Sequence, residues 1–315
     1  MIMVHTIAVI GAGTMGHSLA QVFAQGGLRV WLNDVRDDAL ARARGLIASN
    51  LSGEVDAGLL EKGQEERVIE RILTTTRIED ACAEADIVIE AITENEAAKR
   101  AMFATLDRMC PPHTILASNT SFMDIFKFVM TKRPENVLIT HWFAPPHIVP
   151  LVEVVRGPQT SQETVDAVTT LLTRVGKTPI VISKFLPGFI ANRLQSALTN
   201  EMLFLIDNGY ATAADIDKAA KASFGFRMPI LGVAKKVDFA GVDQIQRSMG
   251  NGLYQPPPCR LNSETMDRLV AEGKLGVKSG QGFFDYGGRS TEEIVRETSV
   301  KLIKLRAFLK ELGEL

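Results

Sequence analysis

Hydrophobic and polar residues follow two different periods along the first 183 residues of the chain. Short unbroken apolar runs, typical of buried parallel strands, are separated by stretches with apolar residues every three or four positions, as in amphipathic helices. The runs lie at 7–10, 29–34, 74–78, 86–92, 114–119, 136–143, 151–155 and 179–183. This alternation predicts an α/β fold with a doubly wound, mostly parallel sheet of the Rossmann type.

The connection between residues 34 and 73 is helical in pattern and contains no strand signal. Because it is longer than an ordinary connection in such a fold, we expect an inserted helix pair there. A later helix is expected to begin with a capping box of Thr160 and Glu163 and to end at Gly176.

After "KFLPG" at 184–188 the pattern becomes purely helical. We therefore predict a Rossmann-type domain over 1–186 and an all-helical C-terminal domain over 187–315. A first long helix is expected to be lined by Phe189, Leu194, Leu198, Met202, Leu205 and Ile206 and to end at Gly209. Capping pairs mark two later helices, Thr212 with Asp215 and Ser290 with Glu293.

The last predicted helix carries an apolar stripe. Its members are Val295, Thr298, Leu302, Leu305, Leu309 and Leu312. Such a stripe is expected to be buried, either against the chain's own core or against a second subunit. We therefore expect a homodimer formed through the helical domain.

Composition narrows the class of protein. The chain has 315 residues, 46% apolar residues and a net charge of −2, which argues against nucleic-acid and membrane-surface partners. Its three cysteines are far apart, which predicts a reducing compartment without disulfides or a zinc site. The first predicted strand starts so early that no signal peptide is expected, and we predict a cytoplasmic protein.

The first strand leads into a glycine motif, "GAGTMG", that contains Gly11, Gly13 and Gly16. A strand, a glycine turn and a helix N-terminus together bind a pyrophosphate through free N–H groups. Asp34 follows the next predicted strand, where a carboxylate bonds the ribose hydroxyl of NAD and repels the 2′-phosphate of NADP. The sequence therefore predicts NAD as the cofactor and no metal.

Polar residues of catalytic type stand at the ends of later segments, "SNTS" (118–121), "HWFAPPHIVPLVEVV" (141–155) and "PGFIANR" (187–193). Removing a hydride from a carbinol carbon also requires a base for the hydroxyl proton, and His141 at a strand end is the best candidate. Glu153 is an acid within an apolar strand and therefore needs a partner, for which His141 is suitable. His5, His113 and, less clearly, His147 are interpreted as structural.

The ordered motifs "GAGTMG", "ADIVIEAITEN", "LASNTS", "HWFAPP", "LVEVV", "PGFIANRL" and "KLGVKSGQGFFDY" resemble those of the 3-hydroxyacyl-CoA dehydrogenase family over nearly the full length. The resemblance implies that His141 is the base, that Glu153 orients it, that Ser121 touches the substrate oxygen and that Asn192 helps to hold substrate or cofactor. The residues expected to bind the cofactor are Gly11, Gly13, Thr14, Met15, Gly16, Asp34, Ala91, Glu94, Lys99 and Asn119.

The sequence also departs from this family. Ala144 replaces the usual Asn, the segment 226–238 is atypical, and no Lys or Arg lies between Arg44 and Lys62 to meet the phosphates of CoA. The exposed pair Lys235 and Lys236 is an alternative anchor for an anionic substrate, although such pairs are usually just solvated.

Three functions remain open at this point. The first expectation is NAD-dependent oxidation of an L-3-hydroxyacyl-CoA to the 3-oxoacyl-CoA. The second is the same chemistry on a small hydroxy acid or a hydroxymethyl aromatic carboxylate without CoA, because the motifs look closer to a side branch of the family. The third is a crystallin-like, NAD-binding structural protein with little turnover.

Overall fold

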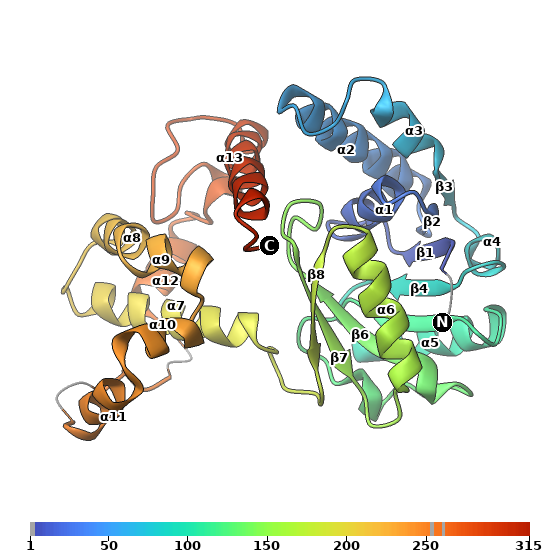
Figure 1. Cartoon of the computed structure of the whole chain (residues 1–315). Helices are drawn as coiled ribbons and strands as arrows, with labels where there is room; N and C mark the ends of the chain where they lie inside the picture. Colours follow the sequence, from blue (N-terminus) through green and yellow to red (C-terminus); the bar gives the residue numbers. More distant parts are fainter. Residues whose placement is uncertain (1–3, 253–254, 260–261) are drawn as a thin grey trace. The chain divides into compact units, whose positions relative to one another are not determined.

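The computed structural model describes residues 4–252, 255–259 and 262–315, and the chain divides into two compact units, 1–190 and 191–315. The division falls a few residues beyond position 186, where the change in hydrophobic pattern placed it. Figure 1 draws the first unit in blue to yellow-green and the second in yellow to red.

The first unit is built on one eight-stranded sheet with the order β3-β2-β1-β4-β5-β6-β7-β8. Its neighbouring strands are parallel except for β6 and β7, which are antiparallel. The strands are β1 (Thr6–Ile10), β2 (Arg29–Asn33), β3 (Ile72–Thr75), β4 (Ile87–Glu90), β5 (Ile115–Ser118), β6 (Val137–Trp142), β7 (Leu151–Arg156) and β8 (Thr178–Ile182). The predicted doubly wound, mostly parallel sheet is confirmed.

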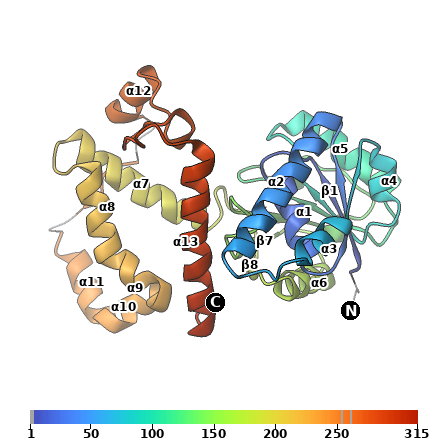
Figure 2. The same cartoon turned by 90° about the horizontal axis from the view of Figure 1, so that it is seen from above.

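Helices cover both faces of this sheet, as Figure 2 shows for α1 and α2 on one side of β1 and α4 and α5 on the other. The helices are α1 (Gly16–Gln25), α2 (Asp37–Asp56), α3 (Gln64–Glu70), α4 (Ile78–Cys82), α5 (Glu96–Met109) and α6 (Gln162–Arg174), with short 3-10 turns η1 (Ile125–Lys127) and η2 (Pro134–Asn136). Each face has its own buried apolar cluster, one under α1, α2 and α6 and the other under α4 and α5. Helices α2 and α3 are the expected inserted pair.

Two local predictions in this unit are wrong. The strand expected at 74–78 ends at Thr75, because the Thr75 hydroxyl accepts a hydrogen bond from the backbone of Arg77 and turns the chain into α4. The helix α6 is capped by Ser161 rather than by Thr160 with Glu163. The buried Thr160 hydroxyl instead donates to the Val137 carbonyl at 2.5 Å and accepts from Gly157 N at 2.8 Å, which holds it away from the helix N-terminus.

The second unit is helical, as expected. It contains α7 (Ala191–Asp207), α8 (Ala213–Ala222), α9 (Phe224–Leu231), α10 (Ala234–Ala240), α11 (Val242–Gly250), α12 (Glu264–Ala271), the turn η3 (Val277–Ser279) and α13 (Thr291–Glu311). The caps at Thr212 and Ser290 are present, and Gly209 follows α7 with a φ of 71°. Phe189, however, precedes α7 instead of lining it, and it is fully buried in the first unit.

Large apolar side chains on the second unit remain exposed in the single chain. On α9 to α11, Phe226 is 78% exposed, Phe239 72% and Met249 80%. The predicted stripe on α13 is also uncovered, since Val295, Leu302, Leu305 and Leu312 are all exposed and Ile294 and Ile303 are the buried residues of that helix. The second unit by itself thus leaves most of the stripe uncovered.

Within the described residues, no helix is both long and apolar enough to span a membrane. The three cysteines are free thiols, with Cys82 and Cys110 buried and Cys259 exposed.

Candidate active site

Glycine occupies each of the three positions in the turn after β1 for a different physical reason. A Cβ on Gly16 would lie 1.7 Å from the Gly11 carbonyl oxygen, so only glycine lets α1 start against the turn. Gly11 has a φ of 103°, and a Cβ there would be 2.7 Å from the Ala91 oxygen. A Cβ on Gly13 would meet no atom within 4 Å, which leaves the open approach to the helix N-terminus that a pyrophosphate requires. The turn therefore fits a dinucleotide.

Asp34 is fixed beside this turn. Its Oδ2 accepts a hydrogen bond from the backbone of Ala12 at 2.8 Å, and its Oδ1 accepts one from Arg36 N at 3.1 Å. The carboxylate is only partly covered, so it stays available to a ribose hydroxyl at the end of β2. Thr14 is exposed on the turn, whereas Met15 packs against the core below it.

His17, which carried no signal in the sequence, lies in the first turn of α1. Its Nδ1 donates to the Gly13 carbonyl oxygen at 2.9 Å, and burial lowers the pKa of the ring below its usual value. A positive charge at a helix N-terminus is unfavourable for the same reason that an anion there is favourable. His17 thus braces the glycine turn through its hydrogen bond to Gly13.

His141 and Glu153 are brought together by strand pairing. They are direct partners in the antiparallel register of β6 and β7, and Nδ1 of His141 donates to Oε2 of Glu153 at 2.7 Å. The other carboxylate oxygen accepts a hydrogen bond from Ile190 N at 2.9 Å. Both side chains are buried, with 4% of His141 and none of Glu153 exposed.

Aromatic rings enclose this pair. The His141 ring makes an edge contact with Phe143, at 4.5 Å between centroids, and a tilted contact with Phe189 at 5.1 Å. Because a carboxylate can only accept, the Nδ1 of His141 carries the hydrogen of this bond. Within the described residues, Nε2 has no hydrogen-bond partner. The arrangement is that of a general base with an orienting carboxylate.

A second buried carboxylate, Glu90, was missed from the sequence. It is fully buried at the end of β4, where its Oε1 accepts from Lys99 Nζ at 2.7 Å and from Ile92 N at 2.9 Å. Its Oε2 accepts from the Ser118 hydroxyl at 2.6 Å. Glu90 is the one acid inside the apolar run "IVIEAI", and burial of its charge demands these partners, which is the signal that could have found it.

Lys99 connects Glu90 to Glu94. Only 1% of the Lys99 side chain is exposed, and its Nζ lies 3.4 Å from Oε2 of Glu94. Glu94 Oε1 in turn accepts from Ser121 N at 2.6 Å and from the Thr120 hydroxyl at 2.9 Å. The lysine is therefore enclosed by protein, and what reaches the surface is Glu94, which holds the backbone of Ser121.

Asn119 links the segment after β5 to the catalytic strand. Its Oδ1 accepts a hydrogen bond from the backbone of Trp142, next to His141, at 3.1 Å. Its own backbone N donates to the Glu90 carbonyl oxygen at 2.8 Å. The carboxyl ends of β1, β4, β5 and β6 thus carry the glycine turn, Glu90, Ser121 and His141 at one edge of the sheet.

Four predicted residues remain to be placed. Ala91 follows β4 and faces Gly11 across the turn. Asn192 lies on the first turn of α7, in the second unit. Lys235 and Lys236 lie on α10, in the same unit. No group of three or more potential ligands in the described part of the chain is arranged to hold a metal ion.

A Rossmann sheet with a dinucleotide turn and a histidine–carboxylate pair at its carboxyl edge defines a dehydrogenase-like oxidoreductase. Family models then match the chain in order: 3-hydroxyacyl-CoA dehydrogenase, NAD binding domain, over residues 6–185, and 3-hydroxyacyl-CoA dehydrogenase, C-terminal domain, over 188–286. The chain belongs to the 3-hydroxyacyl-CoA dehydrogenase family, as its motifs indicated, and NAD is its cofactor.

Two curated relatives differ in what they act on. A probable 3-hydroxybutyryl-CoA dehydrogenase of Bacillus subtilis is 38% identical and covers 89% of this chain and 96% of its own. A 5-formyl-3-hydroxy-2-methylpyridine 4-carboxylate 5-dehydrogenase of Mesorhizobium japonicum is 32% identical and covers 98% of this chain and 99% of its own.

Solved structures show the same division. The crystal structure of a 5-formyl-3-hydroxy-2-methylpyridine 4-carboxylic acid 5-dehydrogenase, described as an NAD⁺-dependent dismutase, has a TM-score of 0.86 at 32% identity and covers 98% of this chain and 99% of its own. A 3-hydroxybutyryl-CoA dehydrogenase of Escherichia coli has a TM-score of 0.75 at 35% identity and covers 91% of this chain and 61% of its own.

Proposed function

We propose that this protein oxidises a hydroxyl group to a carbonyl with NAD and that His141 is the general base. The observation that carries the proposal is the buried 2.7 Å hydrogen bond between His141 and Glu153. Nε2 of His141 takes the hydroxyl proton, and the Glu153 carboxylate stabilises the imidazolium that results. Bound NAD supplies the hydride acceptor.

The surrounding residues support specific roles. Glu153 is held by Ile190 N as well as by His141, so the carboxylate cannot rotate away from the ring. Ser121 is assigned to the substrate oxygen, with its backbone held by Glu94. Asn192 is assigned to holding the substrate or cofactor once both are bound. Lys99 is buried, and it acts through Glu94 rather than by direct contact with the cofactor.

The remaining cofactor residues form two sets. Gly11, Gly13, Gly16 and the exposed Thr14 present the turn to the pyrophosphate, and Asp34 is assigned to the adenosine ribose. A bulky group on Gly13 would occupy the open approach to α1. The preference for NAD over NADP is carried by the charge of Asp34.

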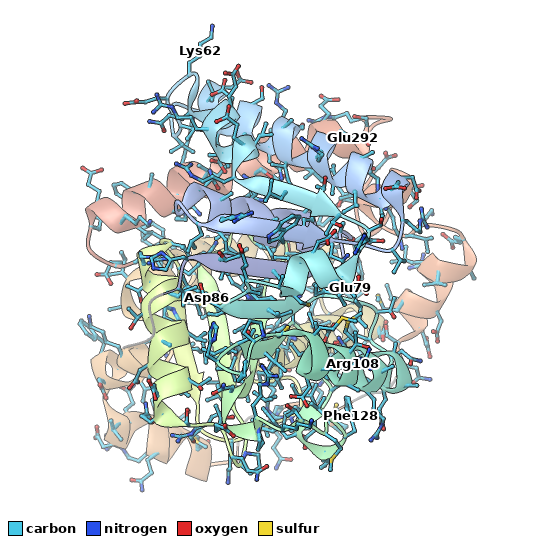
Figure 3. The ribbon with its side chains drawn as sticks, turned by 90° about the vertical axis from the view of Figure 1, so that its right-hand side faces the viewer. Lys62, Glu79, Asp86, Arg108, Phe128 and Glu292 are labelled. Carbon is cyan, nitrogen blue, oxygen red and sulfur yellow. The ribbon has the colours of Figure 1, made fainter. Side chains whose placement is uncertain are left out.

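For the substrate, we favour a small hydroxy carboxylate without CoA, including hydroxymethyl aromatic carboxylates. The structure of the pyridine carboxylate dehydrogenase spans 98% of this chain with a TM-score of 0.86, compared with 0.75 for the 3-hydroxybutyryl-CoA dehydrogenase, and the relative of the same name also spans 98% of the chain. The inserted helices also carry no Lys or Arg between Arg44 and Lys62. Glu54 on α2 is buried and accepts hydrogen bonds from Gln21 and Gln25. Lys62 lies between α2 and α3 and projects into solvent beside acidic residues (Figure 3).

An L-3-hydroxyacyl-CoA is the second candidate, favoured by the 38% identity to the probable 3-hydroxybutyryl-CoA dehydrogenase. A substrate screen that follows NADH formation, with CoA esters and free hydroxy acids side by side, tests both. Turnover confined to the CoA esters would overturn the preference for a small carboxylate. NADH binding without turnover on any substrate would instead support a purely structural role, although a structural role gives no reason for the His141–Glu153 pair.

We also propose that two chains form a dimer through the second unit. The exposed apolar side chains of α9 to α11 and the uncovered stripe on α13 are more apolar surface than a lone helical unit normally leaves in water. Sedimentation at micromolar concentration tests this proposal, and a monomer would overturn it. Truncation after Tyr286 tests whether α13 takes part in the dimer interface.

A further inference from the structure

The connection from Phe143 to Pro150 joins the strand of His141 to the strand of Glu153, and it is fastened to the dinucleotide-binding helix α1. The Ser18 hydroxyl lies 2.7 Å from Nδ1 of His147, and His147 N donates to the same hydroxyl oxygen at 3.0 Å. Ser18 is fully buried, two positions beyond Gly16. Neither the motifs nor the family resemblance pointed to these two residues.

The directions of the two hydrogen bonds follow from the donors present. The Ser18 oxygen accepts from the backbone N–H of His147, and its hydroxyl hydrogen then needs an acceptor. Among the described residues, Nδ1 of His147 is the acceptor within reach. Ser18 therefore fixes both the backbone and the ring of His147, which a single contact would not do.

The end of β6 and the connection that follows it have two further attachments. Trp142, next to His141, packs edge-on against Phe23 of α1 with 5.5 Å between centroids. Lys177 is buried, donates to the carbonyls of Pro146 and Val149, and lies over the Trp142 ring. Lys177 comes from β8's side of the connection and Phe23 makes an apolar contact, whereas the Ser18–His147 pair is the hydrogen-bonded link between the connection and α1.

We propose that Ser18 and His147 are positioning residues that hold the His141–Glu153 pair in line with the dinucleotide bound at the N-terminus of α1. A general base and a hydride acceptor must reach the same carbon, and a misplacement of about 1 Å can cost roughly 100-fold in rate. The pair supplies a short rigid link between the helix that begins at Gly16 and the connection between the two catalytic strands. The kinetic part of this proposal rests on the proposed function.

The test compares Ser18→Ala, His147→Val and His147→Asn. Alanine keeps the helix and removes the hydroxyl, valine removes the ring nitrogen, and the asparagine amide oxygen can still accept from Ser18. We expect Ser18→Ala and His147→Val to lower kcat roughly 10–100-fold, and His147→Asn to recover much of that loss. The Ser18→Ala/His147→Val double variant should be no slower than the slower single variant, since both remove one link.

Matched controls are Thr173→Ala on α6, which loses an exposed helical hydroxyl, and His113→Asn, which changes an exposed histidine. Both should leave kcat unchanged. If Ser18→Ala does not fold, the difference in kcat between His147→Asn and His147→Val makes the same test in a protein that keeps Ser18.

A readout independent of turnover separates this proposal from the proposed function. In the NADH complex, the His141 Nδ1 proton should give a protected downfield NMR signal that broadens in Ser18→Ala and His147→Val but persists in His147→Asn and both controls. If the NMR signals follow this pattern but no substrate is turned over, the positioning role of Ser18 and His147 is supported and the proposed reaction is contradicted. Wild-type kcat and an unchanged signal in Ser18→Ala would overturn the inference and leave the pair as packing only.

Discussion

His141 and Glu153 are opposite each other on the one antiparallel pair of strands in the described sheet. The reversal brings the end of β6 beside the start of β7, so His141 and Glu153 are brought together by backbone pairing rather than by loop conformation. Their 2.7 Å hydrogen bond is buried on the same face of the sheet as Phe189.

Replacing the proposed base tests the mechanism directly. His141→Ala should lower kcat by roughly 10²–10⁴-fold, the usual contribution of a positioned general base, while NADH binding stays nearly unchanged. Glu153→Gln should slow the reaction less, because it keeps a polar partner but removes the negative charge. Steady-state kinetics and fluorescence titration measure the two properties. Near-normal turnover in His141→Ala would rule out this base.

The two effects should combine less than additively, since an orienting carboxylate matters only while the base is present. The His141→Ala/Glu153→Gln double variant provides this comparison. A loss equal to the product of both single losses would show that Glu153 acts independently of the histidine.

Cofactor preference should depend on Asp34. Asp34→Ala removes both the bond to the ribose and the repulsion of a 2′-phosphate, so the affinities for NADH and NADPH should move closer together. Parallel titrations with the two nucleotides measure the change. Because Asp34 also accepts from Ala12 N, Asp34→Asn serves as a control that retains an acceptor there. Equal or tighter binding of NADPH by the wild type would contradict the assignment.

The Glu90–Lys99 pair should be important for stability. Lys99→Met leaves a fully buried carboxylate without its counter-charge and should destabilise the protein by about 3–5 kcal/mol. Lys221→Met removes a lysine from an exposed pair and should cost about 0–1 kcal/mol. Denaturant unfolding monitored by circular dichroism compares them. Similar losses of unfolding free energy in the two variants would mean that Glu90 is neutralised by another partner or by protonation when Lys99 is replaced.

Acid stability should depend on Asp107. Burial raises the pKa of Asp107, but hydrogen bonds from Thr131 and Lys132 N and the charge of Arg133 outweigh it and hold the pKa below its ordinary value. The carboxylate therefore stabilises the fold above its ordinary pKa, and this contribution is lost as the pH falls through the lower folded value.

Asp107→Asn should accordingly be less stable than the wild type at neutral pH, with a gap that narrows below about pH 4. Unfolding free energies measured across that range check the sign. A gap that is constant with pH would assign the loss to the hydrogen bonds alone. Glu311→Gln, near the exposed end of α13, is a control expected to show little difference.

The glycine turn, Asp34 and the His141–Glu153 partnership could be predicted because each leaves a local signal. Glycines mark a turn that no side chain fits, and an acid in an apolar strand requires a partner. The positions of most strands and the helix pair followed from periodicity. Phe189 was misplaced because it continues the apolar spacing of α7, although its backbone, with a φ of 49°, has not yet entered the helix.

Other features had no signal of that kind. Ser18 and His147 are 129 positions apart, and each is unremarkable in its own segment. Thr160 and Ser161 are both good caps by type, and the choice between them depends on the Val137 carbonyl, which attracts the Thr160 hydroxyl. Hydrophobic periodicity indicates which residues are buried, but it does not indicate which buried polar groups form hydrogen bonds with one another.

The placement of the base on a strand also limits how such an enzyme can diverge. Side chains on a strand alternate between faces, so Thr140 and Trp142 point away from the face that carries His141, and Trp142 belongs to the cluster under α1. A base that stays on β6 and on this face could move only to position 139, where it would face Val155 instead of Glu153. New specificities in descendants of this chain must therefore arise by reshaping the walls around a fixed proton acceptor.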